Sequence, residues 1–373
     1  MRRRLFLAIN ILPLTAALLL PSPGVLKSNE VREQQWHLNS LAVTDAHKIS
    51  RGQGVLVAVI DTGVDPHPDL VGNLQPGTDV YKGGTGDGRI DGDPNGHGTA
   101  MAGLIASHGT APGDGTLGIA PEAAILPIRD SRQREEGSPD DLAKGIEWAV
   151  SKNAAIISIS SSGTSSPALR SAIESAIKAD TVVIASAGNK PAHYLIGFPA
   201  AIDGVVAVGA VDRNGLRATI SVSGRELDIS APGVEIFSTR KNGGYAEGTG
   251  TSPAAAIVAG AAALVRSRFP ELSAQEVVHR LTYTAVDKGA PGRDDEYGHG
   301  VLNLVAALTA DVPPLNGTAT PRATPPSTPA DSAQPKEEPG DAVRSVLVSL
   351  LGVGLAVGLL VLGYRRHRRR NPL

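Results

Sequence analysis

The chain has 373 residues, and its 35 Lys and Arg against 37 Asp and Glu give a formal net charge of -2. This balance gives no reason to expect a nucleic acid as a partner, since such partners are bound by an excess of basic residues. Cysteine is absent, which excludes disulfide bonds, zinc thiolate sites and a cysteine nucleophile.

The chain begins with a basic start and an apolar run, MRRRLFLAINILPLTAALLL. This pattern is typical of a secretory signal peptide, to which we assign residues 1–26; the alternative is an uncleaved N-terminal anchor. Roughly a dozen residues follow before the next patterned segment, too few for an independent inhibitory pro-domain. We therefore expect one folded domain over residues 27–310, with a short N-terminal extension.

Apolar runs alternate with helical patterns through residues 55–310, which predicts an α/β fold: a parallel sheet with helices on both faces. Strands are expected at 55–60, 124–128, 155–159, 181–185 and 205–208. Helices are expected at 99–107, 139–152, 167–179 and 303–310, and two more begin at Ser252 and at the capping box of Ser273 and Glu276.

Two of these elements carry a titratable side chain beside glycine. The strand at 55–60 is followed by Asp61, so a carboxylate stands at the C-terminal end of a buried parallel strand, where open α/β sheets place their sites. The stretch NGHGTAMAGLIA places His97 between two glycines at the start of a helix. Both residues are therefore candidates for chemistry.

A third candidate lies in residues 248–268, GTGTSPAAAIVAGAAALVRSR, where a Gly-rich turn brings Ser252 to the start of a long apolar helix. A helix N-terminus favours negative charge, as an oxyanion formed during acyl transfer would require. The alternative is that Ser252 only caps its helix. With Asp61 and His97, however, Ser252 completes the residue types of an activated nucleophile.

The composition changes after Ala310. Residues 311–344 contain eight prolines and are expected to form an extended, disordered linker. Residues 345–364 are uncharged and would form about 30 Å of helix, enough to cross a bilayer. The basic tail at 365–373 then stays in the cytoplasm by the positive-inside rule, which predicts a single-pass protein of the cell membrane with its folded domain outside the cytoplasm.

The segments around Asp61, His97 and Ser252, in this order, resemble the three signature motifs of the subtilase family of serine proteases. The stretch VVIASAGN, ending at Asn189, resembles the family segment whose Asn contributes to the oxyanion hole. The resemblance covers residues 34–310 and implies a subtilisin-like fold, a catalytic triad of these three residues, a protein or peptide substrate, and no cofactor.

A narrower resemblance is to the mycosins, the subtilases associated with type VII secretion in actinobacteria. It rests on the segment REQQWHL, on the GHGTAMAG form of the His motif and on the C-terminal membrane segment. It implies components of a type VII secretion membrane complex as partners. Mycosins commonly carry disulfides, so the absence of cysteine is a departure from that group.

Two further departures concern the site. The family usually has proline four residues beyond the serine; here that position is Ala256, and Pro253 restricts the backbone of Ser252 towards extended values. The segment SISSSG resembles the family's substrate-binding strand, which implies substrate contacts for Ser160, Ser161, Ser162 and Gly163. A peptide would bind there as an added strand, and Ser162 would narrow the pocket. The rival interpretation is a catalytically weak or inactive structural subunit that stabilises a secretion membrane complex.

The remaining acidic and histidine residues are given structural roles. Asp91, Asp93 and Asn95 match the first half of an EF-hand loop, but the position that needs a bidentate Glu is Ala102, so we expect a solvated acidic loop and no metal site there. Many subtilases bind calcium elsewhere, but no ligand set can be named. Solvated loop positions are expected for Asp65 and Asp69. Surface or supporting positions are expected for His67, His108, His193, His279 and His299.

Overall fold

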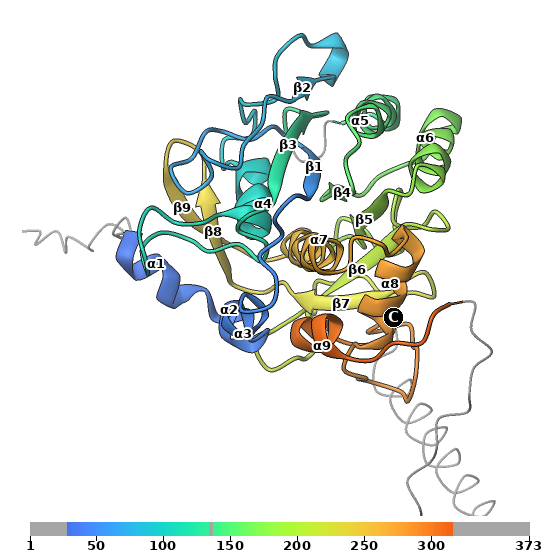
Figure 1. Ribbon diagram of the computed structural model, residues 1–373. Helices are drawn as coiled ribbons and strands as arrows, with labels where there is room; N and C mark the ends of the chain where they lie inside the picture. The colour runs from blue at the N-terminus through green and yellow to red at the C-terminus, as the bar shows by residue number, and fades with distance from the viewer. Residues whose placement is uncertain (1–27, 134–136, 316–373) are drawn as a thin grey trace, which may run out of the picture. The chain divides into compact units, whose positions relative to one another are not determined.

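The main sheet of the computed structural model, which describes residues 28–133 and 137–315, is parallel throughout (Figure 1). Within these residues its strand order is β2-β3-β1-β4-β5-β6-β7. The strands are β1 (Leu56–Asp61), β2 (Thr78–Asp79), β3 (Ala124–Arg129), β4 (Ile156–Ile159), β5 (Val182–Ser186), β6 (Val206–Val211) and β7 (Ile229–Pro232). The five predicted strands are confirmed, whereas β2 and β7 were not predicted.

The predicted helices are also confirmed, with ends that differ by one or two residues. They are α4 (His97–Ala106), α5 (Pro139–Ser151), α6 (Pro167–Lys178), α7 (Thr251–Arg268), α8 (Ala274–Tyr283) and α9 (Leu304–Thr309). Local capping explains several starts. Ser138 accepts a hydrogen bond from the Asp141 N–H at the start of α5, and Ser273 and Glu276 form the predicted capping box of α8.

Helices cover both faces of the sheet, as predicted. Helices α5 and α6 bury Ile146 and Ile173 against one face, where they meet Ile60 and Ile157 of the strands. Helices α4 and α7 pack on the other face, and α7 is buried from Thr251 to Val265 (Figure 1). The run of alanines in α7 lets it lie close to the sheet, so the helix that carries Ser252 has little freedom to move.

An antiparallel hairpin, β8 (Ile236–Arg240) and β9 (Gly244–Gly248), lies outside the main sheet and leads directly into α7. Its strands are only partly buried, with charged and glycine residues among them. The sequence analysis did not predict it, because no continuous or alternating apolar run marks these residues.

The N-terminal extension lies on the folded domain as α1 (Ser28–Gln34), α2 (Trp36–Ser40) and α3 (Val43–Ala46). Arg32 donates hydrogen bonds to the carbonyl oxygens of Asp114, Gly115 and Thr116, at 3.0, 2.9 and 3.3 Å. Trp36 donates its indole N–H to the carbonyls of Val234 and Glu235. These contacts fix the extension to two loops that are remote in sequence.

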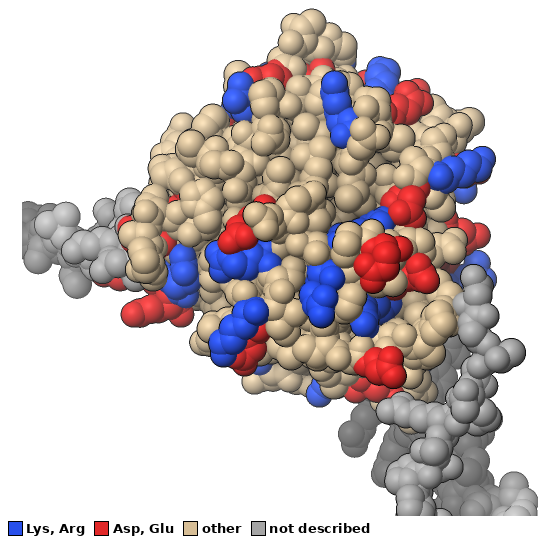
Figure 2. All heavy atoms as spheres, in the orientation of Figure 1, with Lys and Arg blue, Asp and Glu red and all other residues tan. Residues whose placement is uncertain are grey.

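Charges of both signs are interspersed on the surface shown in Figure 2, without an extended patch of one sign on the described part of this face. In the described part of the chain, no helix combines the length and apolarity needed to cross a membrane. The predicted signal peptide (1–26), membrane helix (345–364) and basic tail (365–373) lie outside the described residues, as does the linker apart from residues 311–315. These boundaries stay predictions.

Candidate active site

Asp61 and His97 meet at the carboxyl edge of the sheet. Asp61 is the last residue of β1 and only 5% exposed, and His97 is the first residue of α4. The Nδ1 atom of His97 lies 2.7 Å from Oδ1 of Asp61. Gly98 permits this approach, because a Cβ there would lie 2.1 Å from the carbonyl oxygen of Gly63. The glycine beside the histidine is therefore a packing requirement of the pair.

The environment of Asp61 favours its ionised form. Burial alone would raise the pKa of Asp61, but the positive charge and hydrogen bond of His97, with the hydrogen bond from the Thr62 N–H, hold it below its ordinary value. The Thr62 N–H donates at 2.7 Å and its hydroxyl lies at 3.2 Å. An ionised Asp61 would hold a proton on Nδ1 of His97 and leave Nε2 as an acceptor.

Ser252 is the second residue of α7, after the N-cap Gly250, so the interpretation that Ser252 only caps its helix is wrong. Its Oγ donates a hydrogen bond to the carbonyl oxygen of Ser160 at 2.9 Å. Pro253 lies in the first turn, where its missing N–H leaves no intrahelical bond unmade. Ser252 itself belongs to the helix and is not forced into the extended conformation that a following proline favours.

The described structure does not join His97 to Ser252. Nε2 of His97 is buried and has no hydrogen-bond partner among the described residues. The hydroxyl of Ser252 is directed to Ser160 instead. The geometry therefore shows an assembled pair of Asp61 and His97, in which Nε2 is free to accept a hydrogen bond. The Ser252 hydroxyl does not make this bond in the described structure.

Asn189 follows β5 and is oriented by the start of α7. Its Oδ1 accepts hydrogen bonds from the N–H and the hydroxyl of Thr251, at 2.9 and 3.2 Å. Because a backbone N–H can only donate, the oxygen must be the atom that faces Thr251, and the NH₂ group lies on the other side of the amide. Thr251 also accepts from the Gly188 N–H at 3.1 Å. The sequence analysis overlooked Thr251, although it directly precedes the candidate nucleophile.

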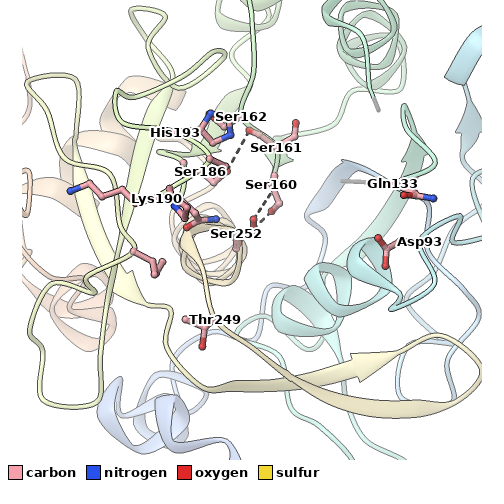
Figure 3. Close-up of a pocket in the computed structure, with 15 residues that line it drawn as sticks. Asp93, Gln133, Ser160, Ser161, Ser162, Ser186, Lys190, His193, Thr249 and Ser252 are labelled. Atoms are coloured by element: carbon pink, nitrogen blue, oxygen red, sulfur yellow. Dashed lines mark hydrogen bonds between the residues drawn. The ribbon is translucent and has the colours of Figure 1, made fainter. Parts of the chain in front are cut away.

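A cavity of about 580 Å³ lies in front of Ser252 and Asn189. It is lined by Ser160, Ser161 and Ser162, whose predicted substrate contacts stay a prediction, whereas Gly163 lines a neighbouring cavity of about 340 Å³. Figure 3 shows Ser252 at the near end of α7 beside Ser160, with Asp93 and Gln133 across the cavity.

Ser162 occupies the wall of this cavity. A Cβ at Gly197 would lie 2.2 Å from Oγ of Ser162, and one at Gly188 would lie 3.2 Å from it. The hydroxyl therefore fills the space between two glycines. His193, for which a surface or supporting position was predicted, lines both cavities. Its backbone N–H donates to the Asn189 carbonyl at 2.9 Å.

One prediction of exposure was wrong. Asp69 was expected to be a solvated loop residue but is fully buried, where its carboxylate accepts from the N–H and hydroxyl of Thr116. His67 is buried beside it, because the β8–β9 hairpin covers this loop: Nε2 of His67 lies 3.0 Å from the Gly244 carbonyl, and its ring meets Tyr245 edge to face.

The loop at 85–96 is also not the solvated acidic loop that was expected. Asp91 and Asp93 are 1% and 5% exposed, because the loop folds inward against β1 and α4. Among the described residues, no group of three or more His, Asp or Glu side chains is placed to hold a metal ion. Asp65 is half-buried and accepts from the Asp91 N–H at 2.8 Å.

Asp130 was not singled out from the sequence. It directly follows β3, is 4% exposed and lines the 340 Å³ cavity. Burial, together with the negative charge of Asp61, raises the pKa of Asp130 to about 7. The signal was present, since an acidic residue follows a predicted apolar strand here as it does at Asp61.

A parallel α/β sheet with these residues at its carboxyl edge defines a class of hydrolytic enzyme, and comparison with known proteins identifies it. The model of the subtilase family (peptidase S8) matches residues 52–300. The chain belongs to this family and is a serine peptidase, and its relatives are named as proteases.

Among curated relatives, subtilisin DY from Bacillus licheniformis is 39% identical over 262 residues, which cover 69% of this chain and 92% of the relative. Subtilisin Savinase from Lederbergia lenta is 38% identical over 276 residues, 73% of this chain and 97% of the relative.

Solved structures include mycosins. The MycP3 protease from the type VII (ESX-3) secretion system is 34% identical, with a TM-score of 0.66, over 74% of this chain and 88% of that one. MycP1 from Mycobacterium smegmatis is 30% identical, with a TM-score of 0.65, over 78% and 89% of the two chains. The predicted resemblance to subtilases, with mycosins as structural neighbours, is confirmed.

Proposed function

We propose that this serine peptidase is a membrane-anchored endopeptidase that cuts peptide bonds outside the cytoplasm with Asp61, His97 and Ser252. One observation carries the proposal. The Asp61 carboxylate lies 2.7 Å from Nδ1 of His97, while Nε2 of the same ring is buried and unpartnered among the described residues. A buried acceptor without a donor is costly, and a nearby serine hydroxyl is the group that would satisfy it.

The reaction follows from these positions. The Ser252 hydroxyl turns from the Ser160 carbonyl to His97, and Oγ attacks the scissile carbonyl carbon as Nε2 takes its proton. The C–N bond of the substrate breaks and His97 gives this proton to the leaving amine. A water molecule then hydrolyses the acyl ester by the same route in reverse order. Asp61 stabilises the imidazolium that forms in each half of the reaction.

The negative oxygen of the tetrahedral intermediate needs donors that are already in place. The NH₂ group of Asn189 is one, since Thr251 holds the amide oxygen on the opposite side. The backbone N–H of Ser252 is the other, because N–H groups in the first turn of a helix have no intrahelical partner. The substrate backbone would lie along Ser160 to Gly163, next to the cavity.

The location and partners rest on the sequence and on the similarity to mycosins. An N-terminal apolar segment at 1–26 and a second one at 345–364 support export and a single-pass anchor in the cell membrane. Three of the similar structures are described as coming from, or being a component of, type VII secretion systems. We therefore place this peptidase beside the membrane components of such a system, with a protein or peptide as its substrate.

Labelling with a fluorophosphonate probe tests the triad. The exported protein is labelled as wild type, as Ser252→Ala and as His97→Ala, with circular dichroism to show that each variant is folded. Covalent labelling of the wild type that is lost in both variants supports the assignment. A folded wild type that is not labelled would contradict a competent site.

A second candidate function is a structural subunit with little or no activity. The observation that favours it is the resting position of Ser252, whose hydroxyl is held by Ser160 and not by His97. The two functions separate in cells. If secretion survives Ser252→Ala but fails when the folded domain is deleted, the structural role is the one that matters.

A further inference from the structure

A second carboxylate lies directly behind the Asp61 and His97 pair. Asp91, from the loop that precedes α4, is 1% exposed. Its carboxylate accepts four hydrogen bonds: at Oδ1 from the Thr62 hydroxyl (2.7 Å) and the Asp93 N–H (3.0 Å), and at Oδ2 from the N–H (2.8 Å) and hydroxyl (2.7 Å) of Thr99. Each carboxylate oxygen thus accepts two hydrogen bonds, so the orientation of the Asp91 side chain is fixed.

The residues that Asp91 holds are the neighbours of the pair. Thr62 directly follows Asp61 at the end of β1, and Thr99 is two residues beyond His97 in the first turn of α4. One buried carboxylate therefore ties the strand that carries the acid to the helix that carries the base. Because Asp91 contacts neither His97 nor Ser252 in the described hydrogen bonds, it acts on the geometry of the pair through these two threonines, and otherwise only through its charge.

The Thr62 hydroxyl has one proton and two carboxylates within reach. It accepts from the Gly98 N–H at 3.0 Å, and it lies 2.7 Å from Asp91 and 3.2 Å from Asp61. The shorter distance assigns the proton to Asp91. Asp61 then loses a competing hydrogen bond on Oδ1, the oxygen that faces His97, and remains the stronger acceptor for the Nδ1 proton.

We propose that Asp91 is a positioning residue for the proposed triad: it fixes the spacing between β1 and α4 and keeps the Thr62 proton away from Asp61. The assignment deepens the proposed function and rests on it for its effect on catalysis. Its structural part, the influence of Asp91 on the Asp61 and His97 pair, does not depend on turnover.

Other charged groups near Asp91 are accounted for. Asp61 lies behind Thr62, and Asp65 accepts from the Asp91 N–H. Lys241, from the turn of the β8–β9 hairpin, donates to the backbone carbonyls of Asp91 and Asp93 at 2.8 and 3.2 Å, and so holds the loop in place. Burial is the main influence that raises the pKa of Asp91, and the charge of Asp61 adds to it.

The test is Asp91→Asn in the full-length protein. Each carboxylate oxygen of Asp91 accepts from one backbone N–H, and the Thr99 N–H is closer (2.8 Å) than the Asp93 N–H (3.0 Å). We therefore expect the amide oxygen of Asn to face Thr99 and its NH₂ group to face Thr62, with the Asp93 hydrogen bond lost. The Thr62 hydroxyl then accepts from this NH₂ group and turns its own proton to Asp61. We expect kcat/KM to fall roughly 10- to 100-fold, the range seen when the outer partners of a site are removed, with KM little changed.

The pH profile separates this role from a merely structural one. A new hydrogen bond on Asp61 and the loss of a negative charge both weaken the stabilisation of the His97 cation. The acid limb of the kcat/KM profile should therefore move to lower pH. Asp87→Asn is the matched control, since Asp87 lies in the same loop and carries the same charge, but its carboxylate pairs with Arg89 and does not contact Thr62.

Three outcomes would overturn the proposal: wild-type kinetics in Asp91→Asn, a fall in kcat/KM with an unmoved acid limb, or the same change in Asp87→Asn. If Asp91→Asn does not fold, Thr62 carries the test. Thr62→Val breaks the link and should lower kcat/KM, whereas Thr62→Ser keeps the hydroxyl and should restore it. Equal activity of these two variants would also overturn the proposal.

A readout without turnover distinguishes this proposal from the proposed function. In a Ser252→Ala background, the proton shared by His97 and Asp61 is followed by NMR as a downfield imidazole resonance. This resonance should shift in Asp91→Asn and stay in place in Asp87→Asn. A wild type that resists the fluorophosphonate probe while the resonance still shifts would refute the catalytic function alone; an unshifted resonance would refute the role of Asp91.

Discussion

Asn189 and Thr251 are locked together across the front of α7: the Thr251 N–H donates to the Asn189 side-chain oxygen at 2.9 Å, and the Thr251 hydroxyl lies 3.2 Å from the same atom. The residue before the nucleophile therefore orients the amide that would stabilise the transition state. This contact explains why a Gly-rich turn places a threonine, and not any small residue, directly before Ser252.

Replacing Asn189 by Leu should reduce kcat by roughly 10²- to 10³-fold and leave KM nearly unchanged, a range measured for the corresponding asparagine of a subtilisin. The reason is that the NH₂ group contacts charge that exists only in the transition state. Steady-state kinetics on a peptide substrate measures both constants. Thr251→Ser keeps both hydrogen-bond donors to Asn189 and is the matched control. A rise in KM of the Asn189 variant by a similar factor would argue instead that Asn189 binds the substrate.

Gly98→Ala should abolish activity and destabilise the fold by several kcal/mol, on the order of the largest single-residue effects. The new Cβ would lie 2.1 Å from the Gly63 carbonyl and 3.2 Å from the Cβ of Asp61, so β1 and α4 must separate. Urea unfolding measures the loss. Gly72→Ala is the control, because its Cβ would meet only His108, at an ordinary 3.6 Å; a stable, active Gly98→Ala would show that α4 can shift freely.

Arg32→Ala should release α1 from the folded domain. Three carbonyl oxygens would lose their donor, and leaving buried acceptors unsatisfied costs about 1–3 kcal/mol each where water cannot replace the donor. The expected result is a lower Tm and rapid proteolysis near residue 35, with kcat/KM unchanged. Arg51→Ala is a matched loss of charge, since Arg51 is exposed and pairs with Glu122 at the surface. Protection of α1 equal to wild type would contradict the role of Arg32.

His37 predicts an acid sensitivity of the fold. The residue is fully buried in α2, neither ring nitrogen has a partner among the described residues, and burial lowers its pKa to about 3. The unfolded chain, with an ordinary pKa near 6.5, takes up the proton first. The contribution of His37 to stability is therefore complete above pH 6.5 and falls, by roughly 1.4 kcal/mol per pH unit, as the pH drops from there towards 3.

His37→Leu should remove this part of the pH dependence and cost little at pH 7, because an apolar side chain leaves no buried polar atom unpaired. Urea unfolding of both proteins at pH 7 and pH 5 measures the difference. His279→Leu, at a half-exposed position of α8, is the control and should keep the wild-type pH dependence. Parallel pH curves for wild type and His37→Leu would show that His37 stays neutral in both states.

The site residues that could be predicted share one property: each lies within two residues of a glycine, where a regular element begins or ends. Asp61, His97 and Ser252 all meet this description, and the continuous apolar strands next to them are readable without knowledge of their partners. The order of the motifs then identified the family. Catalytic residues at the edge of a parallel sheet can thus be predicted from sequence, because the end of an apolar strand and a nearby glycine indicate this edge.

The buried acids could not be predicted in this way. Asp69 is buried by Thr116 and by a hairpin more than 170 residues away, with His67 bonded to Gly244. Asp91 is buried because two threonines from other elements satisfy its carboxylate. A polar loop with several acidic residues looks solvated until these partners are known, since burial of an acid depends on donors that tertiary structure supplies.

The β7 strand and the β8–β9 hairpin were missed for a related reason. Residues 226–232, ELDISAP, mix charges, small residues and proline, and they form a strand because β6 offers an adjacent edge. The hairpin has one partly exposed strand after the other. Its turn dipeptide, Asn242-Gly243, was overlooked because no alternating apolar run flanks it. The hairpin leads directly into the helix of Ser252, so it bears on the site although its composition does not indicate this.

The attachment of the N-terminal extension has a consequence for control of the enzyme. Its anchor bonds lead to residues 114–117 and 234–235, and none of residues 28–50 lines the cavities around Ser252, Gly163 or His97. Residues 28–50 therefore brace one side of the folded domain and do not block these cavities. Removal of residues 28–50 is therefore expected to weaken the fold without uncovering any of these three cavities.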